Sequence, residues 1–253
     1  MNLEFELYSE QLKSYLYRLT ANKEDAEDLL HDTFIKAQER IETFKGNSSL
    51  KTWVFSIATN LAKDNQRVKN RWEIDVQDKC KSAAVENPHV AERIISSFGK
   101  QADLQFEVRE HINYCFTCIA KNLSIEKQIA IILKEIYDFK RTEIAEVLNV
   151  SEGVVKHLLH DGRKELQLKY ENRCAIINKK GVCYQCAELN DFLQTEKNSA
   201  EKITKLGLSQ NKSPEENLKI RFQIINQINP LNSNGADLED TILQILRETI
   251  KDQ

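Results

Sequence analysis

The chain is poor in the residues that form tight turns. It contains only 7 glycines and 3 prolines among 253 residues, too few for a fold built from many short strands. A β-sandwich or β-barrel is therefore disfavoured, and the composition favours an all-α fold. Neither of the glycine-rich phosphate motifs GxGxxG and GxxxxGK(S/T) occurs, and no nucleophile is paired with a base. We therefore expect the protein not to be an enzyme.

Nothing in the sequence predicts a membrane or a secretory pathway. The longest uninterrupted apolar run, 129–133, is far shorter than the roughly 20 residues that a spanning helix needs. The N-terminus, MNLEFELYSEQ, is acidic and lacks the basic stretch followed by an apolar stretch of a secretory signal. We expect a cytoplasmic protein, in which the 6 cysteines are thiols or metal ligands rather than a disulfide framework.

Charge is distributed unevenly, although the net charge is only −3. Residues 1–35 hold eight acidic and three basic side chains, whereas residues 36–72 hold eight basic and three acidic ones. Apolar spacing in the acidic block predicts two helices separated near residues 20–23. A loop at 45–49, where Ser48 or Ser49 can cap the next helix, precedes an apolar stripe that starts near Trp53.

The remaining chain divides by periodicity. From 73 to 107 the apolar pattern weakens, and we interpret this stretch as a linker with room for a short helix. Strong helical periodicity returns from 112 to 168. Residues 187–253 are expected to form a weakly packed helical appendage, with a helix that starts at Ser213-Pro214. A second apolar face there comprises Leu238, Ile242, Ile245, Leu246 and Ile250.

The most informative stretch is 141–166, RTEIAEVLNVSEGVVKHLLHDGRKEL, which has the pattern of a helix-turn-helix. Ala145 is the small residue where the helices approach, and Asn149 tolerates left-handed geometry in the turn. Ser151 can cap the second helix, whose N-terminus would then face a phosphate backbone. Apolar residues would lock the two helices together: Ile144, Leu148, Val150, Val155 and Leu158. An ordinary amphipathic helix pair with a solvated charged face is the alternative.

Residues 25–72, DAEDLLHDTFIKAQERIETFKGNSSLKTWVFSIATNLAKDNQRVKNRW, resemble region 2 of bacterial sigma factors of the extracytoplasmic-function (ECF) group, within the sigma-70 family. Residues 119–168 resemble region 4 of the same group, including its helix-turn-helix. The resemblance implies an all-α protein with two small helical domains. Its parts are a region 2-like bundle at 1–72, a linker at 73–107, a region 4-like helix-turn-helix domain at 108–173, and a cysteine-containing segment with a helical C-terminal extension at 174–253.

This resemblance implies a transcription-initiation factor that binds RNA polymerase core, directs it to promoter DNA and helps to open the duplex. An anti-sigma factor is a further candidate partner. The acidic second helix would face the polymerase through Asp25, Glu27, Asp28, Leu29 and Asp32. An acidic, partly apolar helix face suits a basic partner surface and would repel DNA. A merely solvated helix face is the alternative.

The resemblance also implies two sets of DNA-binding residues. The set for the −10 element comprises Gly46, Asn47, Ser48, Ser49, Trp53, Asn60, Lys63, Asp64 and Arg67. Trp53 could equally be a core residue, and burial is the role that we favour for it. The set for the −35 element comprises Ser151, Lys156, His157, His160 and Arg163. Two departures from the family pattern, Asp161 and Gly162, predict a weaker grip on phosphate at the −35 element.

The cysteines form two CxxC pairs. Cys115 with Cys118 and Cys183 with Cys186 have the spacing that lets four thiolates hold one tetrahedral ion, so one structural zinc is the cofactor that we expect. His111, which with Cys115 and Cys118 resembles the motif of zinc-binding anti-sigma factors, and Cys174 are spare candidate ligands. Inert core thiols and redox-active thiols remain the alternatives.

A second hypothesis is a one-component helix-turn-helix transcriptional regulator that senses metal or redox state through its cysteine cluster. Transcription from a defined promoter by core polymerase plus this protein would exclude that hypothesis. The sigma-factor interpretation expects two units on a flexible tether. A single continuous core that also buried Arg67 and Lys156 would contradict it.

Overall fold

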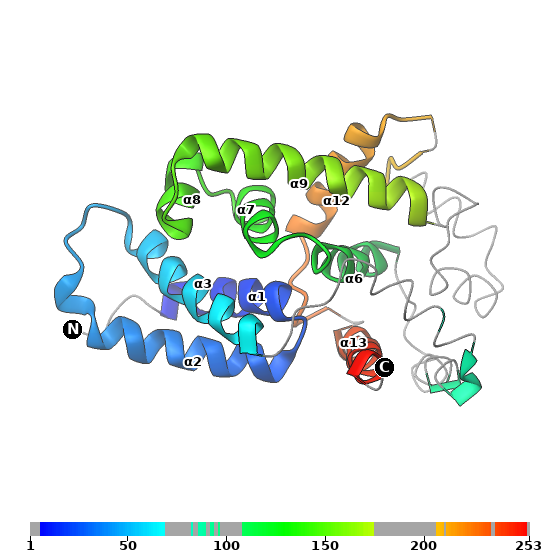
Figure 1. The fold of residues 1–253 in the computed structure, drawn as a ribbon, viewed down its shortest axis with the longest axis horizontal. Helices are drawn as coiled ribbons and strands as arrows, with labels where there is room; N and C mark the ends of the chain where they lie inside the picture. The colour runs from blue at the N-terminus through cyan, green and yellow to red at the C-terminus, as the bar shows by residue number, and fades with distance from the viewer. Residues whose placement is uncertain are drawn as a thin grey trace.

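The computed structural model of the protein describes residues 6–68, 82, 86–89, 92–93, 96, 108–174, 206–209, 211–233 and 236–251. Within these ranges every regular element is a helix (Figure 1), which confirms the expected all-α fold. None of the helices in the described ranges is both long and apolar enough to cross a membrane.

The first helices form a front unit. Helix α1 (Glu6–Thr20) ends where the sequence predicts, and α2 (Lys23–Glu39) begins after Asn22, whose side-chain oxygen accepts the N–H of Asp25 at 2.8 Å. A 3-10 turn, η1 (Ile41–Thr43), and a loop lead to α3 (Leu50–Val68). Of the two serines proposed as its cap, Ser49 accepts the N–H of Thr52 at 3.1 Å.

A rear unit of four helices contains the helix-turn-helix. It comprises α6 (Val108–Ala120), α7 (Ile125–Glu135), α8 (Arg141–Leu148) and α9 (Glu152–Arg173). Asn149 adopts the left-handed conformation between α8 and α9 (φ 53°, ψ 52°), and Ser151 caps α9 by accepting the N–H of Val154. Both turn residues therefore do what the sequence predicts.

The C-terminal segment, residues 206–251, adds α12 (Pro214–Asn226) and α13 (Ala236–Lys251). Ser213 starts α12 through a reciprocal cap with Glu216, as its sequence predicts. The expectation of weak packing is wrong for α12, which lies against α6 and α9. Phe222 of α12 meets Phe116 of α6 edge to face, with 6.0 Å between ring centroids. The apolar side of α12 thus belongs to the main hydrophobic core.

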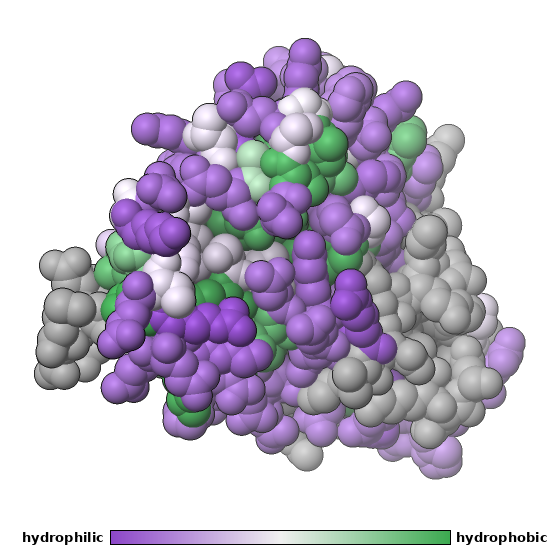
Figure 2. Space-filling model, turned by 60° about the vertical axis from the view of Figure 1, so that its left-hand side comes forward, coloured by the Kyte–Doolittle hydropathy of each residue, from purple (hydrophilic) through white to green (hydrophobic). Residues whose placement is uncertain are grey.

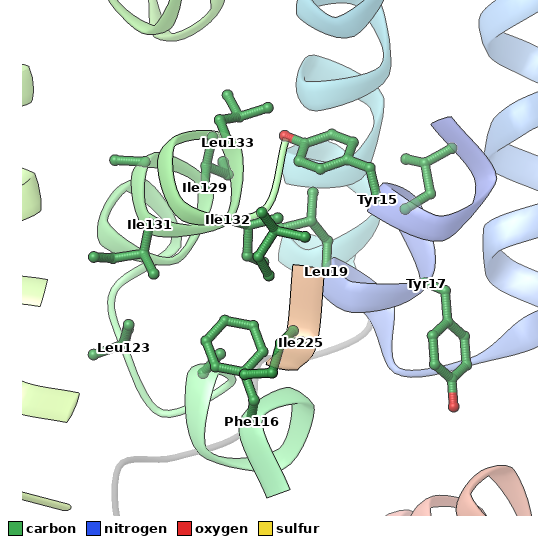
Figure 3. Packing of buried hydrophobic residues seen from close by; sticks show 14 of the residues in the cluster. Tyr15, Tyr17, Leu19, Phe116, Leu123, Ile129, Ile131, Ile132, Leu133 and Ile225 are labelled. Carbon is green, nitrogen blue, oxygen red and sulfur yellow. The ribbon is translucent and has the colours of Figure 1, made fainter. Parts of the chain in front are cut away.

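The front and rear units share one hydrophobic core. Figure 3 shows Tyr15 and Leu19 of α1 beside Ile132 and Leu133 of α7. The ring centroids of Tyr15 and Tyr137 lie 5.8 Å apart. The units are therefore packed together, not separated as the expected tether implies.

A second aromatic contact joins α3 to the start of the helix-turn-helix. The ring centroids of Phe55 and Phe139 lie 5.0 Å apart. The ammonium of Lys51 lies 4.9 Å from the centre of the Phe139 ring, a cation–π geometry. Arg67 and Lys156 nevertheless remain exposed, so the shared core leaves these two cations on the surface.

Arg18 of α1 links three parts of the chain. Its side chain is only 1% exposed. The guanidinium donates to the side-chain oxygen of Asn113 on α6 at 2.7 Å and to the carbonyl of Ile228, just after α12, at 2.9 Å. Gln128 of α7 donates to the Arg18 carbonyl at 3.1 Å. Because a buried charge is tolerated only where its hydrogen bonds are made, these bonds fix the front unit, the rear unit and α12 together.

Replacing Arg18 by alanine should lower the free energy of unfolding by about 3 kcal/mol, because buried acceptors lose a charged donor. Urea denaturation followed by circular dichroism measures the change. Arg67→Ala is the control, since the Arg67 side chain is 80% exposed and forms a surface ion pair with Asp64. The control should change stability by less than about 0.5 kcal/mol. Equal effects of the two variants would contradict the role given to Arg18.

Candidate nucleic-acid interface

Only some of the α2 residues that the sequence predicts for the polymerase surface are exposed. Asp28 and Asp32 are exposed. Glu27 is also exposed but binds Lys13 of α1 at 2.6 Å, and this hydrogen bond and charge lower the pKa of Glu27. Leu29 is 5% exposed and belongs to the core. We therefore remove Leu29 from the candidate polymerase surface, because a buried side chain cannot meet a partner.

Asp25, in the first turn of α2, is half-buried and lies beside α13. The neighbouring Lys23 makes an ion pair with Asp237 of α13 at 2.6 Å. Figure 1 shows α13 next to the end of α2 that follows the α1–α2 turn. The acidic face is therefore open along Asp28 and Asp32 but partly covered at its start.

The loop before α3 contributes exposed residues and one half-buried aromatic. Gly46, Asn47 and Ser49 are exposed, and Ser48 is half-buried. Trp53 packs its ring against Phe44, with 5.2 Å between centroids, and lies against the core. Trp53 as a whole is half-buried, so the residue combines a packing role with partial exposure.

The remaining candidates for the −10 element lie on one face of α3. Asn60, Asp64 and Arg67 are exposed, and Lys63 is half-buried. Arg67 and Asp64 form a surface ion pair at 3.4 Å. Spacings of three and four residues place these side chains on one side of the helix. The opposite side of α3 packs on α1, α2 and α8.

Three candidates for the −35 element project from the second helix of the helix-turn-helix. Lys156, His157 and His160 of α9 are exposed. Sequence reasoning missed Val154, which is 44% exposed beside them. An apolar side chain on an otherwise polar face is the signal that could have identified it, since apolar groups contact the methyl of thymine. Figure 2 shows one side of the molecule, where hydrophilic residues surround small hydrophobic patches.

Arg163 differs from these three. It is half-buried, and its Nε donates to the carboxylate of Glu135 on α7 at 2.9 Å. This ion pair holds α9 against α7. Arg163 therefore fixes the orientation of the helix-turn-helix, and only the exposed remainder of its side chain faces solvent.

Gly162 has a packing role that the sequence did not reveal. A Cβ added at this position would lie 2.9 Å from Cγ1 of Ile131 on α7, closer than side chains normally approach. Ile131 is fully buried. The departure from the family pattern at Gly162 thus allows α9 to lie close to α7, whereas the neighbouring Asp161 is exposed.

Gly162→Ala should lower the free energy of unfolding by about 1 kcal/mol, because the cost of overpacking exceeds the gain in helix propensity. Gly153→Ala is the matched control in the same helix, where the added Cβ would meet only the Ser151 hydroxyl at 3.7 Å. The control should raise stability by roughly 0.5 kcal/mol. Thermal or urea unfolding distinguishes the two signs, and stabilisation by both variants would refute the packing role.

Three cysteines gather near Tyr170 of α9. Cys118 and Cys174 are buried and Cys115 is half-buried. Burial, followed by the neighbouring Cys115 thiol, raises the pKa of Tyr170 well above its usual value. No group of three or more potential metal ligands is assembled within the described part of the chain. Cys183 and Cys186 lie outside the described residues.

The spare candidate His111 precedes Cys115 by one helical turn on α6 and is buried at 3% exposure. Burial lowers the pKa of His111 to about 4, so its imidazole is neutral near pH 7. The ring centroid of His111 lies 6.3 Å from that of Tyr114.

These features define a protein of two all-α modules, the second built around a helix-turn-helix with exposed basic and polar side chains. Family models give the same division. Sigma-70 region 2 matches residues 5–72, and Sigma-70, region 4 matches residues 115–166. The chain belongs to the sigma-70 family of RNA polymerase sigma factors, in its ECF group.

Curated relatives of the chain are also described as ECF RNA polymerase sigma factors. The chain is 29% identical over 164 residues to the ECF RNA polymerase sigma factor SigW of Bacillus subtilis, a match that covers 64% of this chain and 84% of SigW. It is 28% identical over 171 residues to the ECF RNA polymerase sigma factor SigG of Mycobacterium tuberculosis. That match covers 64% of this chain and 46% of SigG, less than half of the relative's length.

Among solved structures, the sigma factor RpoE of Bartonella quintana, in complex with the anti-sigma factor NepR, aligns with a TM-score of 0.44 and 18% identity. The alignment covers 77% of this chain and 96% of that one.

Proposed function

We propose that this protein binds RNA polymerase core, directs it to promoter DNA and helps to open the duplex. The observation that carries the proposal is the exposure of two chemically different surfaces in a sigma-family chain. The open part of the acidic face of α2, with Asp28 and Asp32, suits a basic protein surface. The exposed cations of α3 and α9 suit a polyanion.

At the −35 element, α9 is the helix that would enter the major groove. Its capped N-terminus directs backbone N–H groups towards phosphate, and Lys156 adds an exposed cation. His157 and His160 would meet base edges or the backbone. At the −10 element, the exposed face of α3 would track a strand through Asn60 and Arg67.

The packing of the two units bears on how they would bind DNA. The −10 and −35 elements are, by their numbering, about 25 base pairs apart, or roughly 85 Å along B-form DNA. Helices α3 and α8 are in direct contact. We propose that the units separate when polymerase binds, because one compact molecule cannot reach both elements at once.

Family membership and the expected partner also support a proposed cellular location. A factor that acts with RNA polymerase would work in the cytoplasm, and an anti-sigma factor is a further proposed partner. Among the described residues, no arrangement of side chains favours an enzymatic activity instead.

Run-off transcription with purified core polymerase and a genomic library tests the function. Promoter-specific transcripts should depend on this protein. Lys156→Gln should reduce them about fivefold through the loss of one cationic contact to DNA. Lys219→Gln removes the same charge from an exposed position on α12 and should leave transcription unchanged. Duplex binding without any complex with core polymerase would refute the proposal and favour the one-component regulator.

We also propose one structural zinc ion, held by Cys115, Cys118, Cys183 and Cys186. The two CxxC spacings support this ligand set. Cys174, at the end of α9, lies near Tyr170, as do the thiols of the first pair. The chain therefore leaves α9 close to Cys115 and Cys118, within reach of a second pair nine residues further along.

Metal analysis of protein purified without chelator should give about one zinc per chain, and Cys118→Ser should reduce this strongly. Cys174→Ser is the control and should retain the metal, because Cys174 is outside the proposed ligand set. Less than about 0.2 equivalents in the unmodified protein would rule out the site.

A further inference from the structure

The C-terminal segment contacts both units but is anchored unevenly. Helix α12 lies close to α6 and α9, and the guanidinium of Arg221 stacks 4.1 Å above the centre of the Tyr170 ring. After α12, the carbonyl of Ile228 accepts the buried Arg18 guanidinium at 2.9 Å. These contacts are buried and anchor α12 in the shared core.

Helix α13 is held differently. Its backbone packs less extensively against the other described helices than that of α12, although its side chains Ile242, Leu243 and Ile245 belong to the hydrophobic core. Its polar contacts to the front unit use long side chains at the start of α2. Lys23 binds Asp237, whose side chain is 84% exposed, at 2.6 Å, and Arg247 donates to the carbonyl of Ala21.

A polar, partly open cavity of about 210 Å³ lies between α13 and the start of α2. Its walls include Asn22, Lys23 and Glu24 of the front unit and Asp240, Gln244 and Arg247 of α13. Exposed ion pairs in such a setting contribute little to stability. The ion pair between Lys23 and Asp237 is therefore weak enough to be exchanged for another partner.

Arg247 of α13 carries a positive charge at the start of α2, where a basic partner surface would also carry positive charge. Burial lowers the pKa of Arg247, and the carboxylate of Asp25 is the strongest charge that opposes this shift. Asp25 lies on the same helix face as Asp28 and Asp32, at spacings of three and seven residues. Arg247 also donates to the carbonyl of Ala21 and lines the cavity together with Lys23 and Glu24. An arginine of the chain itself therefore lies at the start of the acidic face.

We propose that α13 is a detachable latch, a helix that covers the start of α2 in the isolated protein. It would compete with polymerase for this end of the acidic face. The inference rests on the proposed function, because it takes the acidic face of α2 as the polymerase-binding surface. Apolar residues of α13, among them Ile242 and Ile245, are buried in the closed state. Release of the latch therefore has a cost that polymerase binding must offset.

The test compares binding of full-length proteins to purified core polymerase. Arg247→Gln removes the cation that binds the carbonyl of Ala21 beside the start of α2 and should tighten binding about fivefold, by raising the fraction of molecules whose α2 is uncovered. Asp237→Asn, which breaks the pair with Lys23 at an exposed position, should tighten binding about twofold. Lys219→Gln is the matched control on α12 and should leave affinity unchanged.

Hydrogen exchange of the amides at residues 22–28 provides a second readout and should be faster in Arg247→Gln than in the unmodified protein. Circular dichroism and the unfolding midpoint establish that the variant is folded. Equal affinities and equal exchange in all four proteins would overturn the latch while leaving the proposed function intact. Failure of all four to bind core polymerase would overturn the proposed function, and the latch with it.

Discussion

The guanidinium of Arg18 must find its acceptors inside the protein, because the side chain is shielded from water. It finds them on α6 and just beyond α12, while the backbone carbonyl of the same residue accepts a hydrogen bond from α7. Helices that are far apart in the sequence are thereby held in one arrangement around α1. The aromatic contacts that bring Tyr137 and Phe139 against Tyr15 and Phe55 depend on that arrangement. The position of α12 between α6 and α9 depends on it as well.

A core shared by the two modules gives the isolated protein a compact state in which, under the proposed function, its exposed surfaces cannot all be used together. The face of α3 and the outer side of α9 remain exposed, but α3 also contacts α8. Engagement of a promoter would then require the energy of polymerase and DNA binding to offset the aromatic contacts between the units. In the proposed scheme the latch at α13 adds a second contact that must be exchanged, and it places the first regulatory step at the start of α2.

Local signals predicted much of this structure, because they arise within a few residues. The break after α1, the left-handed Asn149, and the caps at Ser151 and Ser213 all lie where the sequence predicts. Periodicity did not predict which side chains meet across elements. Leu29 lies among acidic residues in the sequence, which predicts a surface position, yet its side chain is buried in the core. The sequence pattern at Gly162 indicates a change in DNA contact, because its packing neighbour on α7, Ile131, is 31 positions away along the chain. Tyr137 and Phe139 follow α7 in a turn, where apolar spacing carries no helical signal.

The most direct test of the shared core is the nuclear Overhauser effect between aromatic rings in the isolated, full-length protein. Ring centroids 5.0 Å apart for Phe55 and Phe139, and 5.8 Å apart for Tyr15 and Tyr137, place their hydrogens within range of the effect. Cross-peaks between both pairs are expected. Their absence, with the two units tumbling at different rates, would contradict the account.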